Sequence, residues 1–550
     1  MVISENKQSY KNYCTAIIVI GLILIIPLIG VQIVPGHDYI FHVSRIEDVA
    51  EALKYGIFPV RMYVDQVLFW GAPVVIFYPG LFIYIPASLK LAGLSIEICY
   101  NVFIALIFYF GLFASWQGFS MLTRSKYIGF LSSALYISSG YYLLDAYIRN
   151  ALGELSALSF MPLAIACIIN IVNKTKITIR VFILTILSIS AVIESHVLSS
   201  VFLALFGISY AVIKHKKITT TKLRRIALLS IIIVILNAHF IVPFFIFFKN
   251  VPLSVPYIDS FAQSGMKPIF LFRFLIFWNF WIFTFLYVFL SNSFHNFKSL
   301  TESTKKQYYH YFIYLFIGFV FFLASSSVFP WNNLLPLKAV FKNMQFSWRF
   351  LGISTLFLCI CSGYGFYFLL RSIKTSFKTS VILLIMVCVT NMLAFKYLTP
   401  TPFYNMAQKC NWERIRFYCD EDYLYKDLDV DTLFQQDNRF ITDAKISNWQ
   451  KKQTTICFTY DAEHDTEIIL PLINYPGYIA VTKTGDEVQV KENHNHMLTI
   501  SLPKGSGYIK VYHKGFLAFK IADYASLCSF FLLINCLIWV YKKQYWKKTL

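Results

Sequence analysis

Apolar runs of about 20 residues recur along most of the chain, separated by short polar segments. Because about 20 apolar residues are needed to cross the hydrocarbon core of a bilayer, this pattern predicts a polytopic, all-α membrane protein. The runs predict twelve transmembrane helices, at residues 15–34, 98–118, 127–144, 155–172, 181–197, 198–213, 226–248, 269–290, 311–328, 350–370, 379–397 and 523–541. The first run lacks a small-residue cleavage site, and we interpret it as a retained helix rather than a removed signal.

Two long segments between the predicted helices differ from the rest. Residues 35–97 contain an apolar stretch, 77–94, which two prolines, two glycines and a lysine interrupt, and we interpret it as an interfacial or re-entrant helix. Residues 398–522 are polar and change from residue 454 to five alternating patterns, separated by turn residues: TTICFTY, YIAVTK, EVQVKE, MLTISL and YIKVYHK. This pattern predicts short antiparallel strands. The expected domains are therefore 1–397, transmembrane with the long loop 35–97; 398–522, β-rich; and 523–550, a final helix with a basic tail.

Composition agrees with a membrane protein and excludes two other classes. Of 550 residues, 57% are hydrophobic and only 14% are charged, whereas soluble domains carry about 25% charged residues. An ordinary soluble enzyme and a disordered chain are therefore excluded.

The net charge of +20 indicates topology rather than a nucleic-acid partner. With twelve spans and a cytoplasmic N-terminus, the cytoplasmic segments hold 23 of the 49 basic residues and two of the 29 acidic ones. Everything else then carries −1. A thirteenth span at 77–94 would place the basic run 214–225 outside. We therefore expect a multi-pass protein of the cell membrane with both termini in the cytoplasm, and with the first long loop and the β-rich domain outside.

Cysteines and short motifs narrow the chemistry further. Eight of the eleven cysteines lie in or beside apolar runs; Cys410, Cys419 and Cys457 lie in the polar region, and one disulfide among these three stays open. There is no GxxxxGK[ST] loop, no GxGxxG after a strand and no HExxH, so nothing points to a cytoplasmic nucleotide. His494 and His496 flank a polar turn with few acids nearby, and we predict no metal site there.

Polar clusters at predicted helix ends are the candidate functional residues, because ionisable groups in or beside a membrane are costly. The first is Asp38, His42 and Arg45, where the first helix leaves the membrane. Asp38 and His42 are four residues apart and share a helix face, where the carboxylate could act as a general base or hold a metal. The alternative is an Asp38 that caps the helix, with His42 and Arg45 as surface groups.

Three further clusters occur at predicted outer helix ends. Asp145, Arg149 and Glu154 fall in one short loop, where the alternative is a self-contained Asp145–Arg149 pair. His196 follows Glu194, and a lone His there is otherwise an interhelical hydrogen-bonding group. Gln345, Trp348 and Arg349 precede the tenth span. Arg349 suits a lipid phosphate because its planar guanidinium binds two oxygens, although such a Trp–Arg pair is also a common membrane anchor.

At these clusters the chain resembles a known family, the bacterial YfhO-type membrane proteins and the related "6-pyruvoyl-tetrahydropterin synthase-related" membrane proteins. This family is part of the GT-C superfamily of polyprenyl-phosphate-dependent glycosyltransferases. The resemblance is carried by GHDYIFHVSRI (36–46), GIFPVR (56–61), FYPGLFIYIPA (77–87), YIRNALGE (147–154), MQFSWRFL (344–351), EDYLY (421–425) and LPLINYPGYIA (470–480). It implies a GT-C-like fold with an acidic residue in the first outside loop, the place of Asp38. It also implies a second acid in the next outside loop, matched by Asp145 or Glu154.

The resemblance further implies a function. A sugar would move from a polyprenyl-phosphate donor to a cell-envelope acceptor, such as a glycolipid, teichoic acid or polysaccharide, on the outer face. Asp38 would accept the acceptor's proton, and Arg349 and Arg149 would stabilise the departing phosphate. The first loop lacks a DxD pair, so no cofactor is predicted and a divalent cation stays open. The alternatives are a transporter or flippase of envelope precursors, and a non-catalytic membrane protein of envelope assembly.

Overall fold

A computed structural model describes residues 10–29, 36–64, 69–254, 264–271, 302–333, 345–398, 423–436 and 439–549. The chain packs as two compact units. One comprises residues 1–37, 101–229 and 257–407, and the other comprises residues 38–100, 230–256 and 408–550. Both units are interleaved in the sequence, so neither coincides with a single continuous stretch.

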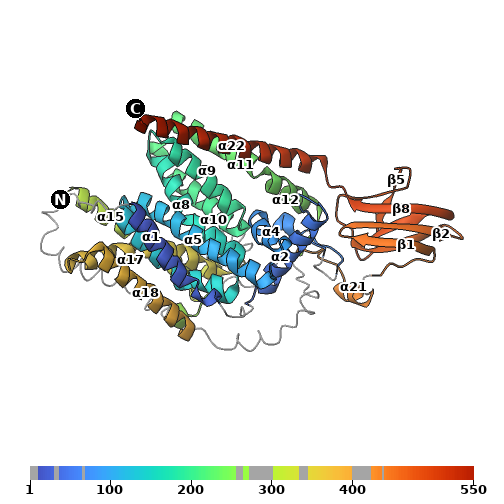
Figure 1. Ribbon diagram of the computed structural model, residues 1–550, viewed down its shortest axis with the longest axis horizontal. Helices are drawn as coiled ribbons and strands as arrows, with labels where there is room; N and C mark the ends of the chain where they lie inside the picture. The colour runs from blue at the N-terminus through green and yellow to red at the C-terminus, as the bar shows by residue number, and fades with distance from the viewer. Residues whose placement is uncertain are drawn as a thin grey trace. The chain divides into compact units, whose positions relative to one another are not determined.

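The first unit is helical (Figure 1). Its elements are α1 (Tyr10–Leu24), most of α5 (Ile96–Thr123), α6 (Lys126–Ile137), α7 (Gly140–Leu144), the single π-helical turn η3 (Asp145–Arg149), α8 (Leu152–Asn173), α9 (Ile179–Ile193), α10 (Val197–Ile213), the first part of α11 (Thr220–Leu236), α15 (Glu302–Ala324), η7 (Ser347–Arg349), α17 (Phe350–Ser372) and α18 (Phe377–Leu398).

Close helix packing builds the core of this unit. α17 packs against α15 and α6, and α8 packs against α9 and α10. Glycine allows the tightest contact: a Cβ on Gly118 of α5 would lie 2.5 Å from the backbone of Pro162 and Leu163 in α8. Small residues at such crossings let helix backbones approach closely, as is usual for helices that pack within membranes.

The helices confirm a mostly helical chain with several apolar helices, but they do not confirm twelve spans. Within the described residues, five helices are long and apolar enough to cross a membrane, at residues 96–123, 152–173, 347–371, 377–395 and 517–539. A sixth span would be α11 with α12 (Ala238–Asn250), which are bent by 77° at their junction. Other predicted spans correspond to helices of 10–17 residues, such as α9 and α10, and most of the span at 269–290 lies outside the described residues.

The stretch at 77–94, which we interpret from the sequence as an interfacial or re-entrant helix, forms short pieces. The chain has a four-residue helix α3 (Val74–Phe77), a 3₁₀ turn η2 (Leu81–Ile83) and the eight-residue α4 (Tyr84–Leu91). These pieces belong to the second unit, together with α2 (Tyr39–Lys54), which packs against α4.

The β-rich part of the second unit is shown in Figure 1. Its described residues form eight strands in two antiparallel sheets. The five-stranded sheet has the order β1-β2-β8-β4-β5 and the three-stranded sheet the order β3-β7-β6. The strands are β1 (Lys445–Lys452), β2 (Thr455–Ala462), β3 (Thr466–Ile473), β4 (Tyr478–Val481), β5 (Glu487–Val488), β6 (Val490–Glu492), β7 (Met497–Leu502) and β8 (Gly505–His513). The predicted β region is therefore confirmed.

Alternation along β2 explains why its strand could be read from the sequence. The side chains of Ile456, Phe458 and Tyr460 are buried on one face of the sheet, while the intervening residues are more exposed. Within the sheet, β2 pairs with β8. Period-two burial of this kind is the signature of a sheet with one face on a core. The last helix, α22 (Leu517–Thr549), follows β8 and lies beside α12 (Figure 1). The Ser526 hydroxyl accepts a hydrogen bond from the His239 amide at 2.9 Å.

The β strands are joined to the first long loop within this unit. The amide of Ile473 donates to the carbonyl oxygen of Trp70 at 3.1 Å. The ammonium of Lys451 donates to the carbonyl oxygens of Phe69 at 2.6 Å and of Pro471 at 2.8 Å. The β strands therefore pack with residues 69–70, although the expected domain boundary at residue 398 assigns the two to different domains.

Candidate functional site

The π-helical turn η3 and the start of α8 place three predicted site residues together in the first unit. Asp145 and Arg149 begin and end η3, and Glu154 lies in the first turn of α8. Between them Asn150 adopts a left-handed conformation with φ of 55°, which redirects the chain into α8. Asparagine tolerates this conformation better than most residues. The amide of Gly36 donates to the Asn150 side-chain oxygen at 2.6 Å.

Arg149 joins both acids through one nitrogen. Its Nη1 donates to Asp145 Oδ1 and, at 2.9 Å, to Glu154 Oε2. The Tyr141 hydroxyl donates to the other oxygen, Glu154 Oε1, at 2.6 Å. Asp145 is fully buried and Glu154 is 5% exposed. The local Asp145–Arg149 pair of the alternative therefore forms, but it is buried and shares its arginine with Glu154.

Arg349 reaches the same carboxylate from a distant part of the sequence. It ends the turn η7 before α17, is 9% exposed, and its Nε lies 3.8 Å from Glu154 Oε2. Its Nε and Nη1 are buried and donate no hydrogen bond within the part of the chain that the structure describes. Buried donors are normally satisfied, so these two donors are open to a partner that the described residues do not supply.

An aromatic side chain and a histidine complete the cluster. The Arg149 guanidinium carbon lies 4.4 Å from the Trp348 ring centroid, a cation–π contact. His196 precedes α10, and its Nδ1 lies 2.9 Å from the Ser199 hydroxyl. His196 lies near enough to interact electrostatically with Glu154 and with both arginines. Gln345 lies four residues before Arg349, with a left-handed φ of 60°.

The second predicted cluster belongs to the other unit. Asp38 is the residue before α2, and its side chain makes no capping hydrogen bond. His42 and Arg45 are 0% and 1% exposed, so the alternative of surface groups is wrong for both. The Arg45 Nη2 donates to the carbonyl oxygens of Tyr78 at 3.2 Å and Pro79 at 2.7 Å. Arg45 thus anchors the chain between α3 and η2.

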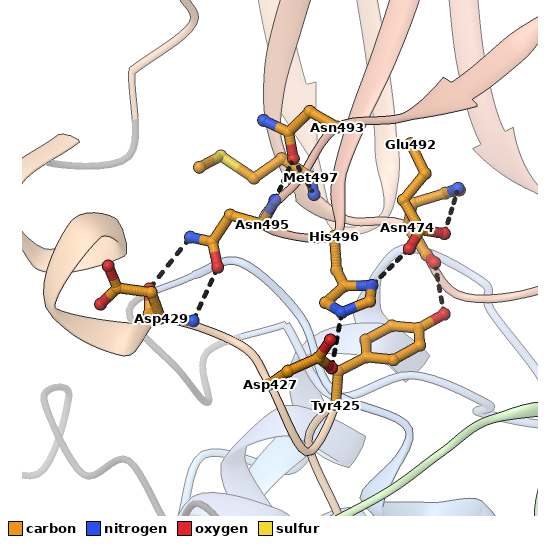
Figure 2. A network of polar contacts seen from close by, with 9 residues as sticks. All are labelled: Tyr425, Asp427, Asp429, Asn474, Glu492, Asn493, Asn495, His496 and Met497. Atoms are coloured by element: carbon orange, nitrogen blue, oxygen red, sulfur yellow. Dashed lines mark hydrogen bonds and ion pairs between the residues drawn. The ribbon is translucent and has the colours of Figure 1, made fainter.

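The polar turn around His496 forms a network of hydrogen bonds (Figure 2). His496 Nε2 lies 2.9 Å from Asp427 Oδ1, its Nδ1 contacts Glu492 Oε1, and its ring stacks on Tyr425 at 4.0 Å. Asn495 accepts from the Asp429 amide at 2.6 Å and donates to the Asp429 carbonyl at 3.0 Å. The hydrogen bond from His496 lowers the pKa of Asp427. This network joins residues 425–429 to the β strands.

The sequence leaves a divalent cation and a disulfide open, and only part of each question falls within the described residues. No group of three or more His, Cys, Asp or Glu side chains there could hold a metal ion. Cys457 is free among the described residues, whereas Cys410 and Cys419 lie outside them.

Sequence reasoning missed two residues of the first-unit cluster. Tyr141 falls within the predicted apolar span 127–144, although its hydroxyl donates to Glu154. Ser199 was likewise placed inside a span, although it contacts His196. Only the spacing of Tyr141, four residues before Asp145, could have indicated a shared helix face.

Comparisons with known proteins give faint likenesses. No family model and no curated protein matches the chain. Among solved structures, the cryo-EM structure of the arabinofuranosyltransferase AftD from Mycobacteria has 14% identity and a TM-score of 0.41, covering 71% of this chain and 27% of that one. The chain therefore spans about a quarter of that protein's length. The crystal structure of ArnT from Cupriavidus metallidurans bound to undecaprenyl phosphate has 12% identity and a TM-score of 0.36, covering 90% of this chain and 98% of that one. Similarities this weak do not support any conclusion about the fold or function of this chain. They also give no support to the narrower YfhO-type family.

Proposed function

We propose that the protein is an integral-membrane glycosyltransferase of the GT-C type, which moves a sugar from a polyprenyl-phosphate donor to a cell-envelope acceptor on the outer face. The observation that carries the proposal is Arg349, a buried guanidinium beside the Arg149–Glu154 pair, with two donors that no described residue accepts from. Because the cluster lies at the ends of apolar helices, an amphiphilic anion such as a lipid phosphate fits it better than a soluble one.

The charges of the cluster are compatible with reversible binding of a phosphate. Two arginines face Asp145 and Glu154, so the site is balanced without ligand. A phosphate can add to the open face of Arg349 through paired, charge-assisted hydrogen bonds. The same donors would stabilise the negative charge that develops on the phosphate as its bond to the sugar breaks. The sugar and the headgroup of the donor would be contacted by the surrounding residues His196, Gln345 and Trp348.

Asp38 is the proposed general base. It would take the proton from the acceptor hydroxyl as that oxygen bonds to the anomeric carbon, while the polyprenyl phosphate leaves with the electron pair of the broken bond. Of its neighbours, His42 stays a proposed substrate-binding residue. Arg45, whose Nη2 donates to two backbone carbonyl oxygens, would act mainly by holding the surrounding loop.

The decisive test is sugar transfer by purified protein in liposomes that contain a radiolabelled polyprenyl-phosphate sugar. We expect Arg349→Ala to reduce transfer by about 100-fold or more, as loss of a transition-state donor does. Arg349→Lys should restore only part of it, since lysine lacks the planar fork. The matched control is Arg371→Ala, an exposed arginine in the last turn of the same α17. Full transfer by Arg349→Ala or by Asp38→Asn would refute the respective role.

A transporter of envelope precursors is the second candidate, and one observation favours it. The helices α11 and α12 are bent by 77° around Asn237, and broken helices are common at transporter binding sites. The same liposomes separate the two functions. Movement of labelled lipid across the bilayer without any sugar transfer would replace the enzyme proposal with the transporter.

A further inference from the structure

Basic residues gather at one end of the helices α8 to α11 in the first unit. Residues 171–229, all of which the structure describes, contain nine lysines and arginines and a single acid, Glu194. The nine basic residues lie before α9 or in its first turn, and between α10 and the second turn of α11. Glu194 follows the other end of α9, which has 15 residues and is therefore about 22 Å long. At that separation salt screens the acid from the basic residues.

Two of these basic residues hold the turns of this end together. Lys222, in the first turn of α11, is 5% exposed. Its ammonium donates to the carbonyl oxygens of Val172 at 2.9 Å, Asn173 at 3.1 Å and Lys217 at 3.0 Å. Three acceptors match the three donors of an ammonium, and none of them is a carboxylate. Arg225 likewise donates to two carbonyl oxygens of the α8–α9 turn, at 2.6 and 3.3 Å. The end of α8 is thereby fixed beside the turn that precedes α11.

Six further basic side chains surround this frame, and together we call them the basic surface. They are Lys174, Lys176, Lys214, Lys216, Lys217 and Arg224. Lys214 is half-buried and the other five are exposed. Within the part of the chain that the structure describes, none of these six side chains makes a hydrogen bond or an ion pair. A group of like charges without acids between them attracts anions.

Exposed apolar side chains adjoin the basic surface and define the kind of anion. Ile208 and Ile213 at the end of α10, and Leu223 at the start of α11, are each more than half exposed. Ile213 directly precedes Lys214, and Leu223 directly precedes Arg224. On a membrane protein, apolar side chains in such a position contact acyl chains, while the neighbouring basic side chains reach lipid headgroups. A free phosphate has no part that contacts the apolar residues, so a lipid fits this end of the helices better.

We propose that the basic surface binds an acidic phospholipid. The phosphodiester of its headgroup contacts the lysines of the η4 turn (His215–Lys217), and its acyl chains pack against Ile213 and Leu223. Lysine ammonium groups bind phosphate as point charges, so the site selects for negative charge rather than for one headgroup shape. The inference goes beyond the proposed function, because it requires neither a sugar donor nor sugar transfer. It also goes beyond topology, since a basic loop can face the cytoplasm without binding a lipid.

The test is titration of the purified full-length protein in a non-ionic detergent, with binding measured by microscale thermophoresis. Two probes have the same short chains and differ in charge: anionic dioctanoyl phosphatidylglycerol and zwitterionic dioctanoyl phosphatidylcholine. A third probe, glycerol phosphate, supplies the phosphate without acyl chains. We expect phosphatidylglycerol to bind most tightly, and its affinity to fall as salt is raised. Lys214→Gln, Lys216→Gln and Lys217→Gln together should weaken its binding by about 10- to 100-fold. Arginine at the same three positions should preserve the binding.

The matched control removes three exposed basic residues from another helix end of the same unit. Arg371→Gln, Lys374→Gln and Lys378→Gln together change the turn between α17 and α18, which the charge pattern also predicts to be cytoplasmic. This variant should bind phosphatidylglycerol as the unmodified protein does. An equal loss in both triple variants would overturn the site, as would absence of binding. Equal binding of the two lipids would overturn the anionic requirement, and equally tight binding of glycerol phosphate would overturn a lipid as the occupant. Since no sugar donor is present, none of these outcomes depends on sugar transfer.

Discussion

At the residue scale, Glu154 balances two arginines, and its charge can be removed without a change of size. Glu154→Gln leaves Arg149 and Arg349 buried with one counter-charge fewer. Breaking a buried ion pair by removing one partner costs about 3–5 kcal/mol. We therefore expect a clearly lower midpoint of thermal unfolding in detergent. Added inorganic phosphate should raise the midpoint more in this variant than in the unmodified protein, because an anion replaces the lost charge.

Tyr141→Phe is the matched variant for that experiment. It removes only the hydrogen bond to Glu154 Oε1 and keeps the charges of Glu154 and of the two arginines. The expected loss is about 1 kcal/mol, the usual net value of one hydrogen bond. If Glu154→Gln unfolds at the same temperature as Tyr141→Phe, the carboxylate is not the counter-charge of the two arginines.

Gly36 is the second residue whose role can be tested directly. A Cβ there would lie 1.9 Å from the carbonyl oxygen of Ile148, and the displaced backbone would lose its hydrogen bond to Asn150. Gly36→Ala should therefore lower both the yield of folded protein and its unfolding midpoint. Gly207→Ala is the control, because its Cβ meets Ile168 at an ordinary 3.6 Å inside helix α10. There alanine should be neutral or stabilise the helix by about 0.5–1 kcal/mol. A larger loss at Gly207 than at Gly36 would contradict this account.

At the scale of elements, the apolar pattern predicts that helices exist, but their ends and breaks depend on packing. The single run 226–248 becomes two helices bent at Asn237, and the run 127–144 breaks at Ser138 before α7. In both runs a short polar residue stands where the helix breaks, and such side chains can hydrogen-bond the backbone in place of the helix. Composition alone does not say which of many such residues will do so.

The strands show the same division between pattern and packing. Alternation predicted β2 and β7, but β3 was missed because Leu470, Leu472 and Ile473 are all buried, and its apolar run does not alternate. β1 was missed for the opposite reason, since it is an edge strand with a bulge after Ser447 and few buried residues. Edge strands and fully covered strands both lose the two-residue period on which the prediction rests.

His513, at the end of β8, predicts that the stability of the β strands is sensitive to acid. Burial lowers the pKa of His513 to about 4, and its Nε2–H donates to the Pro476 carbonyl oxygen at 3.2 Å. Because the folded pKa is below the ordinary value of 6.5, the neutral ring stabilises the fold fully above pH 6.5. That contribution is lost as the pH falls from 6.5 toward 4, by about 3 kcal/mol for a shift of this size.

The measurement is resistance of the β strands to limited proteolysis between pH 7 and pH 4, with an acid-tolerant protease. His513→Gln keeps a donor for Pro476 but cannot take up a proton in this range. Its resistance should therefore change less with pH than that of the unmodified protein. An identical pH profile for the two proteins would show that another group controls acid sensitivity.

At the scale of the whole molecule, the sequence accounts for the net charge and for the class of protein, but not for how the site is assembled. Arg349 and Glu154 are separated by almost 200 residues, and no local pattern pairs them. Both were singled out because charged groups at the ends of apolar helices are costly. That argument finds the members of a cluster one at a time. Which of them meet is decided by helix packing, as with α17 against α6 and α8 against α10.

The topology proposed from charge is a property of the whole chain and can be tested as one. Cytoplasmic loops are rich in Lys and Arg, so the basic segment 214–225 should face the cytoplasm and the β strands should face outside. In a background in which Cys410, Cys419 and Cys457 are replaced by serine, a membrane-impermeant maleimide should label Lys483→Cys in the β4–β5 turn in intact cells. Thr219→Cys should react only after lysis. Both positions are exposed, so lack of reaction reports the side of the membrane rather than burial. Labelling of Thr219→Cys in intact cells would place the β strands and Asp38 on the cytoplasmic side. A donor presented on the outer face would then be out of reach of the proposed base.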